Sequence, residues 1–163
     1  MKGGERRKKA PLVEISAHKL YEGYLVELEH VMGKDITYED DINTICMQLF
    51  GVHWGGVFAR DKMERILARY DATQPMPIIE TKYCIFNLDT RVEGGSHWCA
   101  CALINGLIYI YESFGRGIDM GVSVNNSDLY DREQLIKENN CGPRSIAWLM
   151  VCDRHGIENA MCI

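Results

Sequence analysis

Four residues of this sequence have the types needed for acyl-transfer chemistry: His97, Glu112, Gln134 and Cys141. Cys141 precedes an apolar run, and the sequence after it predicts a helix that begins at Gly142 or Pro143. A thiol at a helix N-terminus faces backbone N–H groups and the positive end of the helix dipole, which favours its thiolate. A histidine that accepts the thiol proton makes this thiolate a nucleophile at neutral pH. These residues therefore predict a cysteine protease.

A β-hairpin is predicted to bring the histidine and the glutamate together. Asn105-Gly106 separates two strand-like runs, and Asn-Gly is the strongest short signal for a two-residue hairpin turn. In that register Cys99 faces Glu112, so His97 lies diagonally across from Glu112 on the same face of the sheet. Diagonal neighbours are about 7–8 Å apart, within reach of long polar side chains. The sequence thus predicts a contact between His97 and Glu112.

The same face of the hairpin carries apolar residues that we expect to be buried: Cys99, Cys101, Leu103, Ile108 and Ile110. We expect the helix that begins near Cys141 to pack on this face and to approach His97. Cys141 would then attack a carbonyl carbon, His97 would hold the thiol proton, and Glu112 would fix the imidazole tautomer. The other cysteines of these segments (46, 84, 99, 101 and 152) are expected to be core residues.

The oxyanion of the tetrahedral intermediate needs hydrogen-bond donors. The backbone N–H of Cys141 at the helix start is one predicted donor. A side-chain amide is a second, and Gln134 stands seven residues upstream. The amides of Asn139 and Asn140 are nearby alternatives.

The remaining pattern predicts a single α+β domain over residues 13–163, preceded by a flexible basic tail over residues 1–12. Helices are predicted over 15–32 (apolar positions Leu20, Tyr24, Leu25, Leu28 and Val31, ended by Gly33), 37–51 (capped by Thr37, with Ile42, Ile45, Cys46 and Leu49 apolar), 62–70, 131–137 and from Gly142 or Pro143 to Gly156. A turn-rich stretch is predicted over 52–58 and a buried strand over 83–88.

Composition narrows the function classes. The net charge of −5 argues against a protein that coats nucleic acid, and leaves the basic residues Arg6–Lys9 as a place for weak nucleic-acid contact or targeting. No run approaches the roughly 18 apolar residues of a membrane span, and no signal-peptide pattern is present. Seven cysteines without a Cys-x-x-Cys pair predict neither a disulfide framework nor a zinc site. We expect a monomer in a reducing compartment, with no metal.

His53-Trp54 is a second histidine-tryptophan pair that also precedes Cys141 and has Asp61 nearby. No predicted hairpin places an acid beside His53. We therefore expect His53 and Trp54 to be structural residues or part of the rim of a substrate cleft.

Several motifs together resemble the adenovirus maturation protease family (adenain), which is grouped with the SUMO-specific proteases. They are Gly-Gly-Ser-His97-Trp98, the later Tyr-Glu112-Ser-Phe-Gly, then Gln134 and Cys141-Gly142. The stretches 56–61 and 86–89 are similar to adenain-type proteases of virophages and Maverick-type elements. The resemblance covers residues 51–152. It implies a papain-like or adenain-like fold, in which a mixed sheet carrying the histidine and the acid packs against the cysteine helix.

The resemblance also implies a substrate and a location. It implies cleavage of capsid-precursor polypeptides at glycine-containing sites, in the virion and in the virus factory or nucleus of an infected cell. Trp98 would flank a groove narrow enough to select glycine, or be a core residue. Asp61 would contact the substrate backbone, or cap a helix. Gly142 and Trp54 complete the substrate-binding residues that we predict.

No cofactor is required by the sequence. An activating peptide or DNA, as in the adenovirus enzyme, is an alternative, although only 22 residues follow Cys141. The first residues, Met-Lys-Gly-Gly4, resemble the cleavage sites of such proteases, so self-processing after Gly4 is a further hypothesis. Other functions also fit: a protease for ubiquitin-like modifiers, an acyltransferase on the same scaffold, or an inactive peptide-binding module. The presence of His97, Glu112, Gln134 and Cys141 together argues against the inactive module.

Overall fold

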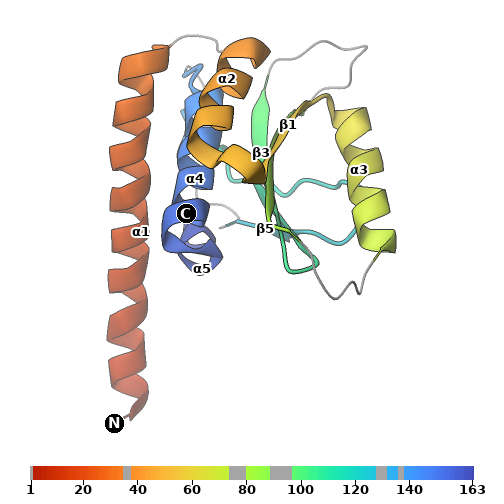
Figure 1. Cartoon of the computed structure of the whole chain (residues 1–163). Coiled ribbons are helices and arrows are strands. Elements are labelled where there is room, and N and C mark those ends of the chain that lie inside the picture. Colours follow the sequence, from red (N-terminus) through yellow and green to blue (C-terminus); the bar gives the residue numbers. More distant parts are fainter. Residues whose placement is uncertain (1, 35–37, 74–79, 89–96, 128–131, 136–137) are drawn as a thin grey trace.

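Helices lie on both sides of a mixed five-stranded sheet (Figure 1). This computed structural model describes residues 2–34, 38–73, 80–88, 97–127, 132–135 and 138–163, and side chains from Ser16 onward. The helices are α1 (Lys2–Met32), α2 (Glu39–Phe50), α3 (Arg60–Ala72), α4 (Cys141–His155), α5 (Ile157–Ala160) and the 3-10 helix η1 (Gly51–His53). The strands are β1 (Trp54–Phe58), β2 (Lys82–Asn87), β3 (Trp98–Ile104), β4 (Leu107–Tyr111) and β5 (Asn125–Asn126).

The sheet has the strand order β1-β2-β3-β4-β5. β1 and β2 are parallel, as are β4 and β5, whereas β3 is antiparallel to both of its neighbours. The predicted hairpin is confirmed, because Ile104 pairs with Leu107 at its end. Asn105 and Gly106 have φ values of 50° and 81°, which are the positive values that a tight two-residue hairpin turn requires. The α+β class is therefore established for the described residues.

The prediction of which face α4 covers is wrong. The sheet residues that cluster with α4 are Tyr83, Ile85, Ala100, Ala102 and Tyr111. The predicted face, with Cys99 and Cys101, packs instead against Met63 and Leu67 of α3. Both faces of the hairpin are apolar, so polarity does not distinguish them. Side-chain volume does: the small alanines of β3 leave room for Trp148 of α4, whose ring stacks on that of Tyr111 at 5.5 Å.

Helix α4 is buried along most of its length because it lies between α1 and the sheet (Figure 1). Helix α1 begins at Lys2, well before the predicted start at Ile15, and so includes part of the stretch predicted as a tail. It ends as predicted before Gly33, whose φ is 83° and whose N–H bonds the carbonyl of Glu29 at 2.8 Å. Its buried residues are Ala17, Tyr21, Leu25 and Leu28. Val31, predicted to face the core, is instead 75% exposed.

Three other predicted elements are corrected. Helix α2 begins at Glu39 after the N-cap residue Tyr38, and Thr37 lies outside the described residues. The stretch predicted as turns contains strand β1, whose glycines hide its strand character. A Cβ at Gly55 would meet the sulfur of Cys84 at 2.7 Å, so glycine permits the close approach to β2. Of the helix predicted over 131–137, residues 132–135 are described and are not helical.

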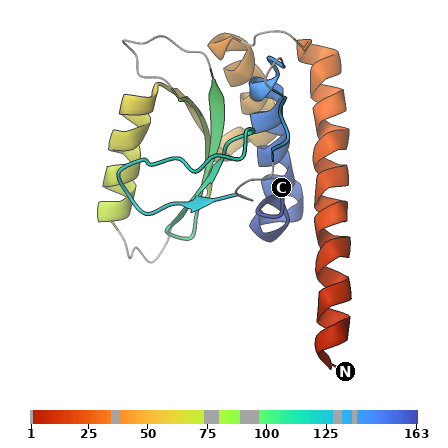
Figure 2. The same ribbon diagram turned by 180° about the vertical axis from the view of Figure 1, so that it is seen from behind.

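Other predicted elements are confirmed. The strand over 83–88 corresponds to β2, the helix over 62–70 to the longer α3, and the last helix ends at Gly156. The segment that follows β4 crosses the α3 side of the sheet before it reaches β5 (Figure 2). Arg60 of α3 holds this segment by a 2.8 Å hydrogen bond to the carbonyl of Asp119.

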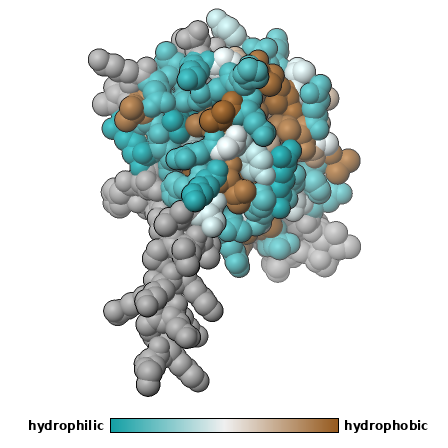
Figure 3. Space-filling model, turned by 90° about the vertical axis from the view of Figure 1, so that its left-hand side faces the viewer, coloured by the Kyte–Doolittle hydropathy of each residue, from teal (hydrophilic) through white to brown (hydrophobic). Residues whose placement is uncertain are grey.

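The surface on the α1 side is mostly hydrophilic, with smaller hydrophobic areas (Figure 3). Two exposed apolar residues of α1 are Val26 and Val31. Within the described part of the chain, no helix has both the length and the apolar character needed to cross a bilayer.

Candidate active site

Cys141 and His97 meet at one end of the sheet. Helix α4 begins at Cys141, and strand β3 begins at Trp98, directly after His97. The backbone N–H of Trp98 donates to the Cys141 sulfur at 3.4 Å, and the hydroxyl of Ser145 donates to the Trp98 carbonyl at 3.2 Å. The helix start and the strand start are therefore fixed to each other. This contact requires only that the N-terminus of α4 lies next to the N-terminus of β3. It therefore forms even though α4 packs on the face of the hairpin opposite to the predicted one.

The imidazole of His97 bridges the thiol and the glutamate. Its Nε2 lies 2.6 Å from Oε1 of Glu112, and the ring is also hydrogen-bonded to Cys141. Because Nε2 is on the carboxylate, Nδ1 is the nitrogen left for the sulfur. The imidazole ring of His97 stacks on the ring of Phe114, with 4.8 Å between ring centres. The backbone carbonyl of His97 accepts a hydrogen bond from the N–H of Leu88 at 2.8 Å. The predicted contact between His97 and Glu112 is present. The backbone of His97 is held by Leu88, and its ring is held by Glu112 and Phe114.

Glu112 is a buried carboxylate with several donors. The backbone N–H groups of Phe114 and Arg116 donate to it at 3.1 and 2.9 Å. The Arg116 guanidinium adds two contacts, from Nε at 3.3 Å and from Nη2 at 3.2 Å. Burial alone would raise the pKa of Glu112, but the hydrogen bonds from His97 and Arg116 hold it at about 2. Glu112 therefore remains a negative partner for the imidazole.

The surroundings of the thiol and the imidazole shift their pKa values toward an ion pair. Burial would raise the pKa of Cys141, but the hydrogen bond with His97 and the N–H groups of Trp98 and Gly142 lower it below its ordinary value. Burial would lower the pKa of His97, but its bonds to Cys141 and Glu112 raise it to about 9. Both shifts favour the thiolate and the imidazolium over the neutral thiol and imidazole.

Selective alkylation tests this pairing. We expect iodoacetamide at about pH 6 to modify Cys141 before the five fully buried cysteines, because burial raises the pKa of each of those thiols. Peptide mass spectrometry after a short exposure would locate the label. In Glu112→Gln the imidazolium loses its negative partner, so the pH at which Cys141 becomes reactive should rise. Equal labelling of Cys141 and Cys152, or an unchanged pH profile in Glu112→Gln, would contradict the ion pair.

Gln134 is buried beside this group, 2% exposed. Its Oε1 accepts the hydroxyl of Ser113 at 2.6 Å, and its Nε2 donates to the carbonyl of Glu138 at 2.6 Å. The second N–H of Nε2 has no acceptor among the described residues. Ser113 follows Glu112 directly, so the amide is held next to the acid. This geometry leaves one amide N–H for an oxyanion, although no described contact joins Gln134 to Cys141.

Asn140, the alternative amide, is fully used elsewhere. Its Nδ2 donates to Glu29 of α1 at 2.8 Å and to Glu138 at 3.1 Å, and its Oδ1 accepts Nε of Arg144 at 3.0 Å. Asn139 is exposed and lies one residue further from the helix. Gln134 therefore remains the better candidate for the oxyanion donor.

Arg144 is a buried residue that the sequence analysis missed. Besides Asn140, its guanidinium donates to the hydroxyl of Tyr21 at 3.1 Å and to Oε2 of Glu138 at 3.1 Å. Tyr21 in turn bonds Tyr111 of β4, with 2.6 Å between the hydroxyl oxygens. This group joins α1, α4, the sheet and the segment that carries Gln134. A charged residue within the mostly apolar stretch 141–152 of α4 is the signal that could have identified it.

The predicted substrate-binding residues occupy different places. Gly142 donates its N–H to the nucleophile, and Trp98 lies next to it with a half-buried ring. Asp61 is in the first turn of α3, and its buried Oδ1 has no hydrogen-bond partner among the described residues. The N-cap of that helix is Ala59. The alternative role of Asp61 as an N-cap is thus wrong. Trp54 pairs with Tyr83 and donates to Asn43 at 2.8 Å.

The second histidine-tryptophan pair lies far from Cys141 along the sheet. β2 pairs with Trp54 at Tyr83 and with Trp98 at Asn87, so the two tryptophans mark opposite ends of this strand. His53 bonds the carbonyl of Thr81 at 3.0 Å through Nδ1. The structure therefore does not bring His53 or Trp54 together with the nucleophile, which fits a structural role.

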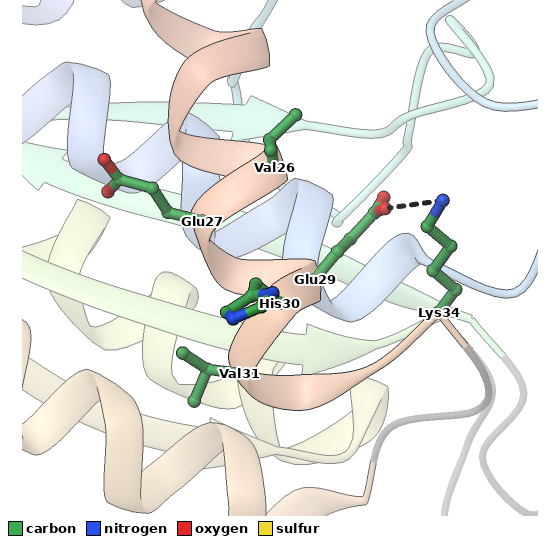
Figure 4. A pocket seen from close by; sticks show the side chains of 6 residues that line it. All are labelled: Val26, Glu27, Glu29, His30, Val31 and Lys34. Carbon is green, nitrogen blue, oxygen red and sulfur yellow. Dashed lines mark ion pairs between the residues drawn. The ribbon is translucent and has the colours of Figure 1, made fainter.

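A separate hollow of about 780 Å³ lies along the C-terminal part of α1 (Figure 4). Its described lining residues are Val26, Glu27, Glu29, His30, Val31 and Lys34. Glu29 points toward Lys34, with 3.8 Å between their charged groups (Figure 4). None of the predicted site residues is among these side chains.

The described residues contain no group of three or more His, Cys, Asp and Glu side chains arranged to hold a metal ion. All seven cysteines are free thiols. The sequence of this chain matches no family model and no curated protein.

Proposed function

We propose that this chain is a cysteine endopeptidase that cleaves viral structural-protein precursors at glycine-containing sites. The observation that carries the proposal is the position of His97, hydrogen-bonded at once to the Cys141 thiol and to the Glu112 carboxylate. The thiol stands at the N-terminus of a helix, where its anion is favoured. A nucleophile, a proton carrier and a group that orients the proton carrier are what nucleophilic acyl transfer requires.

Acylation uses the ion pair directly. The Cys141 thiolate attacks the carbonyl carbon of the scissile amide, forming a carbon–sulfur bond and placing negative charge on the carbonyl oxygen. The backbone N–H of Cys141 and the remaining N–H of Gln134 would donate to this oxyanion. His97 then gives its proton to the amide nitrogen, the carbon–nitrogen bond breaks, and the amine leaves with the C-terminal segment.

Deacylation reverses the roles. A water molecule gives a proton to the now neutral His97 and attacks the thioester carbon. The second oxyanion collapses, the carbon–sulfur bond breaks, and the product leaves as a carboxylic acid that gives its proton to solvent. Cys141 is regenerated as thiolate beside imidazolium. Glu112 stays ionised throughout, because its pKa of about 2 is far below that of the imidazolium.

The proposals of a papain-like, adenain-like fold and of a glycine-containing substrate depend on the sequence motifs around His97 and Cys141. The α+β sheet with a cysteine helix on one face supports a papain-like, adenain-like fold. Trp98 next to the nucleophile would narrow the groove so that side chains larger than hydrogen are excluded, which selects glycine. Capsid precursors, a location in the virion and infected cell, and an activating peptide or DNA are proposed on the sequence resemblance.

The direct test is cleavage of an internally quenched peptide that contains Leu-Ala-Gly-Gly, followed by mass spectrometry of the products. We expect cleavage after the second glycine. Alanine in place of that glycine should lower kcat/KM by roughly 10-fold or more, since one methyl group in a tight pocket costs about 1–3 kcal/mol. Equal cleavage of the alanine peptide would overturn the glycine selectivity, and absence of cleavage would overturn the proposed activity on such sites.

A further inference from the structure

Two arginine side chains lie over the ring that supports the histidine. The guanidinium carbons of Arg116 and Arg132 are each 5.1 Å from the centre of the Phe114 ring. The His97 ring stacks on the same phenylalanine, with 4.8 Å between centres. The whole chain has a net charge of −5, so two arginines on one ring stand out against its overall charge.

The two arginines differ in what they bind. Arg116 donates from Nε and Nη2 to the buried carboxylate of Glu112, so its charge is balanced inside the site. Arg132 donates its Nε to the carbonyl of Gln134 at 2.7 Å, and within the described part of the chain no carboxylate pairs with it. Its side chain is exposed. Arg132 therefore presents guanidinium N–H groups to whatever lies next to the site.

The reaction determines which part of a substrate lies there. The scissile nitrogen takes its proton from His97, so the leaving segment departs beside the imidazole, whereas the preceding residues stay bonded to Cys141. Arg132 contacts the same Phe114 ring as the imidazole, so its guanidinium carbon is at most the sum of the two ring distances from the imidazole centre. An extended chain covers about 3.3–3.6 Å per residue, so this distance is within the first three residues of the leaving segment.

We infer that Arg132 forms a subsite for an acidic side chain, Asp or Glu, at one of the first three positions after the scissile bond. This inference rests on the proposed protease function and adds a charge requirement on the leaving side of the substrate. A guanidinium binds a carboxylate through paired, charge-assisted hydrogen bonds. Gln134 accepts Nε of Arg132 through its backbone carbonyl, which holds the guanidinium beside the candidate oxyanion donor.

The experiment compares peptides that share Leu-Ala-Gly-Gly and differ only at the first three following positions, with Glu, Gln or Lys at each in turn. Because Arg132 is exposed, we expect one Glu peptide to exceed its Gln counterpart in kcat/KM by about 5-fold, the upper range for an exposed ion pair. The preference should weaken as salt is raised, since salt screens exposed charges. Arg132→Glu should favour the Lys peptide instead.

Binding to Cys141→Ala, measured by fluorescence anisotropy, separates this inference from the protease activity itself. If no peptide is cleaved, the proposed function fails, and the binding comparison of Glu with Gln peptides still decides the subsite. Arg154→Glu is the matched control, since Arg154 is an exposed arginine in the last turn of α4. Thermal unfolding, with Arg132→Gln as a second variant, shows whether each variant is folded. Equal affinities, absence of binding, or a Glu preference that survives in Arg132→Glu would overturn the inference.

Discussion

Replacing Cys141 with alanine is expected to lower kcat/KM for the Leu-Ala-Gly-Gly peptide by roughly 10⁵-fold or more, as loss of the nucleophile does in comparable triads. The sulfur is the atom that forms the bond to the substrate, and no other thiol touches His97 among the described residues. The substitution removes one buried atom, and His97 keeps its bond to Glu112. The fold should therefore persist, and the loss should be in kcat.

Cys152→Ala is the matched control for this variant. Cys152 lies in the same helix and is also buried, about three helical turns from Cys141. Steady-state kinetics and thermal unfolding of both variants would separate loss of chemistry from loss of packing. We expect Cys152→Ala to be destabilised and yet active below its unfolding temperature. A kcat/KM for Cys141→Ala within about 10-fold of that of the unsubstituted chain would refute a nucleophilic role for Cys141.

Arg144→Met is expected to lower the free energy of unfolding by about 1–3 kcal/mol, the usual cost of leaving buried hydrogen-bond partners unsatisfied. The guanidinium serves three acceptors, on Tyr21, Asn140 and Glu138, and a thioether replaces none of these hydrogen bonds. Burial would lower the pKa of Arg144, but its tyrosine and glutamate partners raise it, so the charge is retained at all ordinary pH values. Urea unfolding followed by circular dichroism measures the loss.

Two further variants make this prediction specific. Arg154→Met changes an exposed arginine of the same helix, which stacks on Tyr24, and should cost about 1 kcal/mol or less. Arg144→Lys keeps the charge but lacks the planar fork, so it should be intermediate. Because the Arg144 group holds the residue before Cys141, iodoacetamide labelling of Cys141 should also slow in Arg144→Met. Equal stability of Arg144→Met and Arg154→Met would show that the buried group contributes little.

The sequence alone determined the local structure around the site. Asn105-Gly106 fixed the hairpin register because few residue pairs adopt positive φ at both turn positions. That register placed His97 near Glu112 before any long-range contact was considered. The sequence around Cys141 likewise determined a helix start, since the preference for such a start depends on residues adjacent in the chain. Gly33 and Gly156 determined helix ends for the same reason.

The tertiary structure decided what depends on contacts between distant segments. Either face of the hairpin is apolar enough to receive a helix, and only the fit of Trp148 against the alanines of β3 places α4 on one of them. Strand β1 forms because its glycines can approach β2, a neighbour far along the chain. The buried guanidinium of Arg144 is stable only because partners from α1 and the segment before α4 converge on it. Tyr21 is 123 residues from Arg144 along the chain, so no local pattern of the sequence specifies that contact.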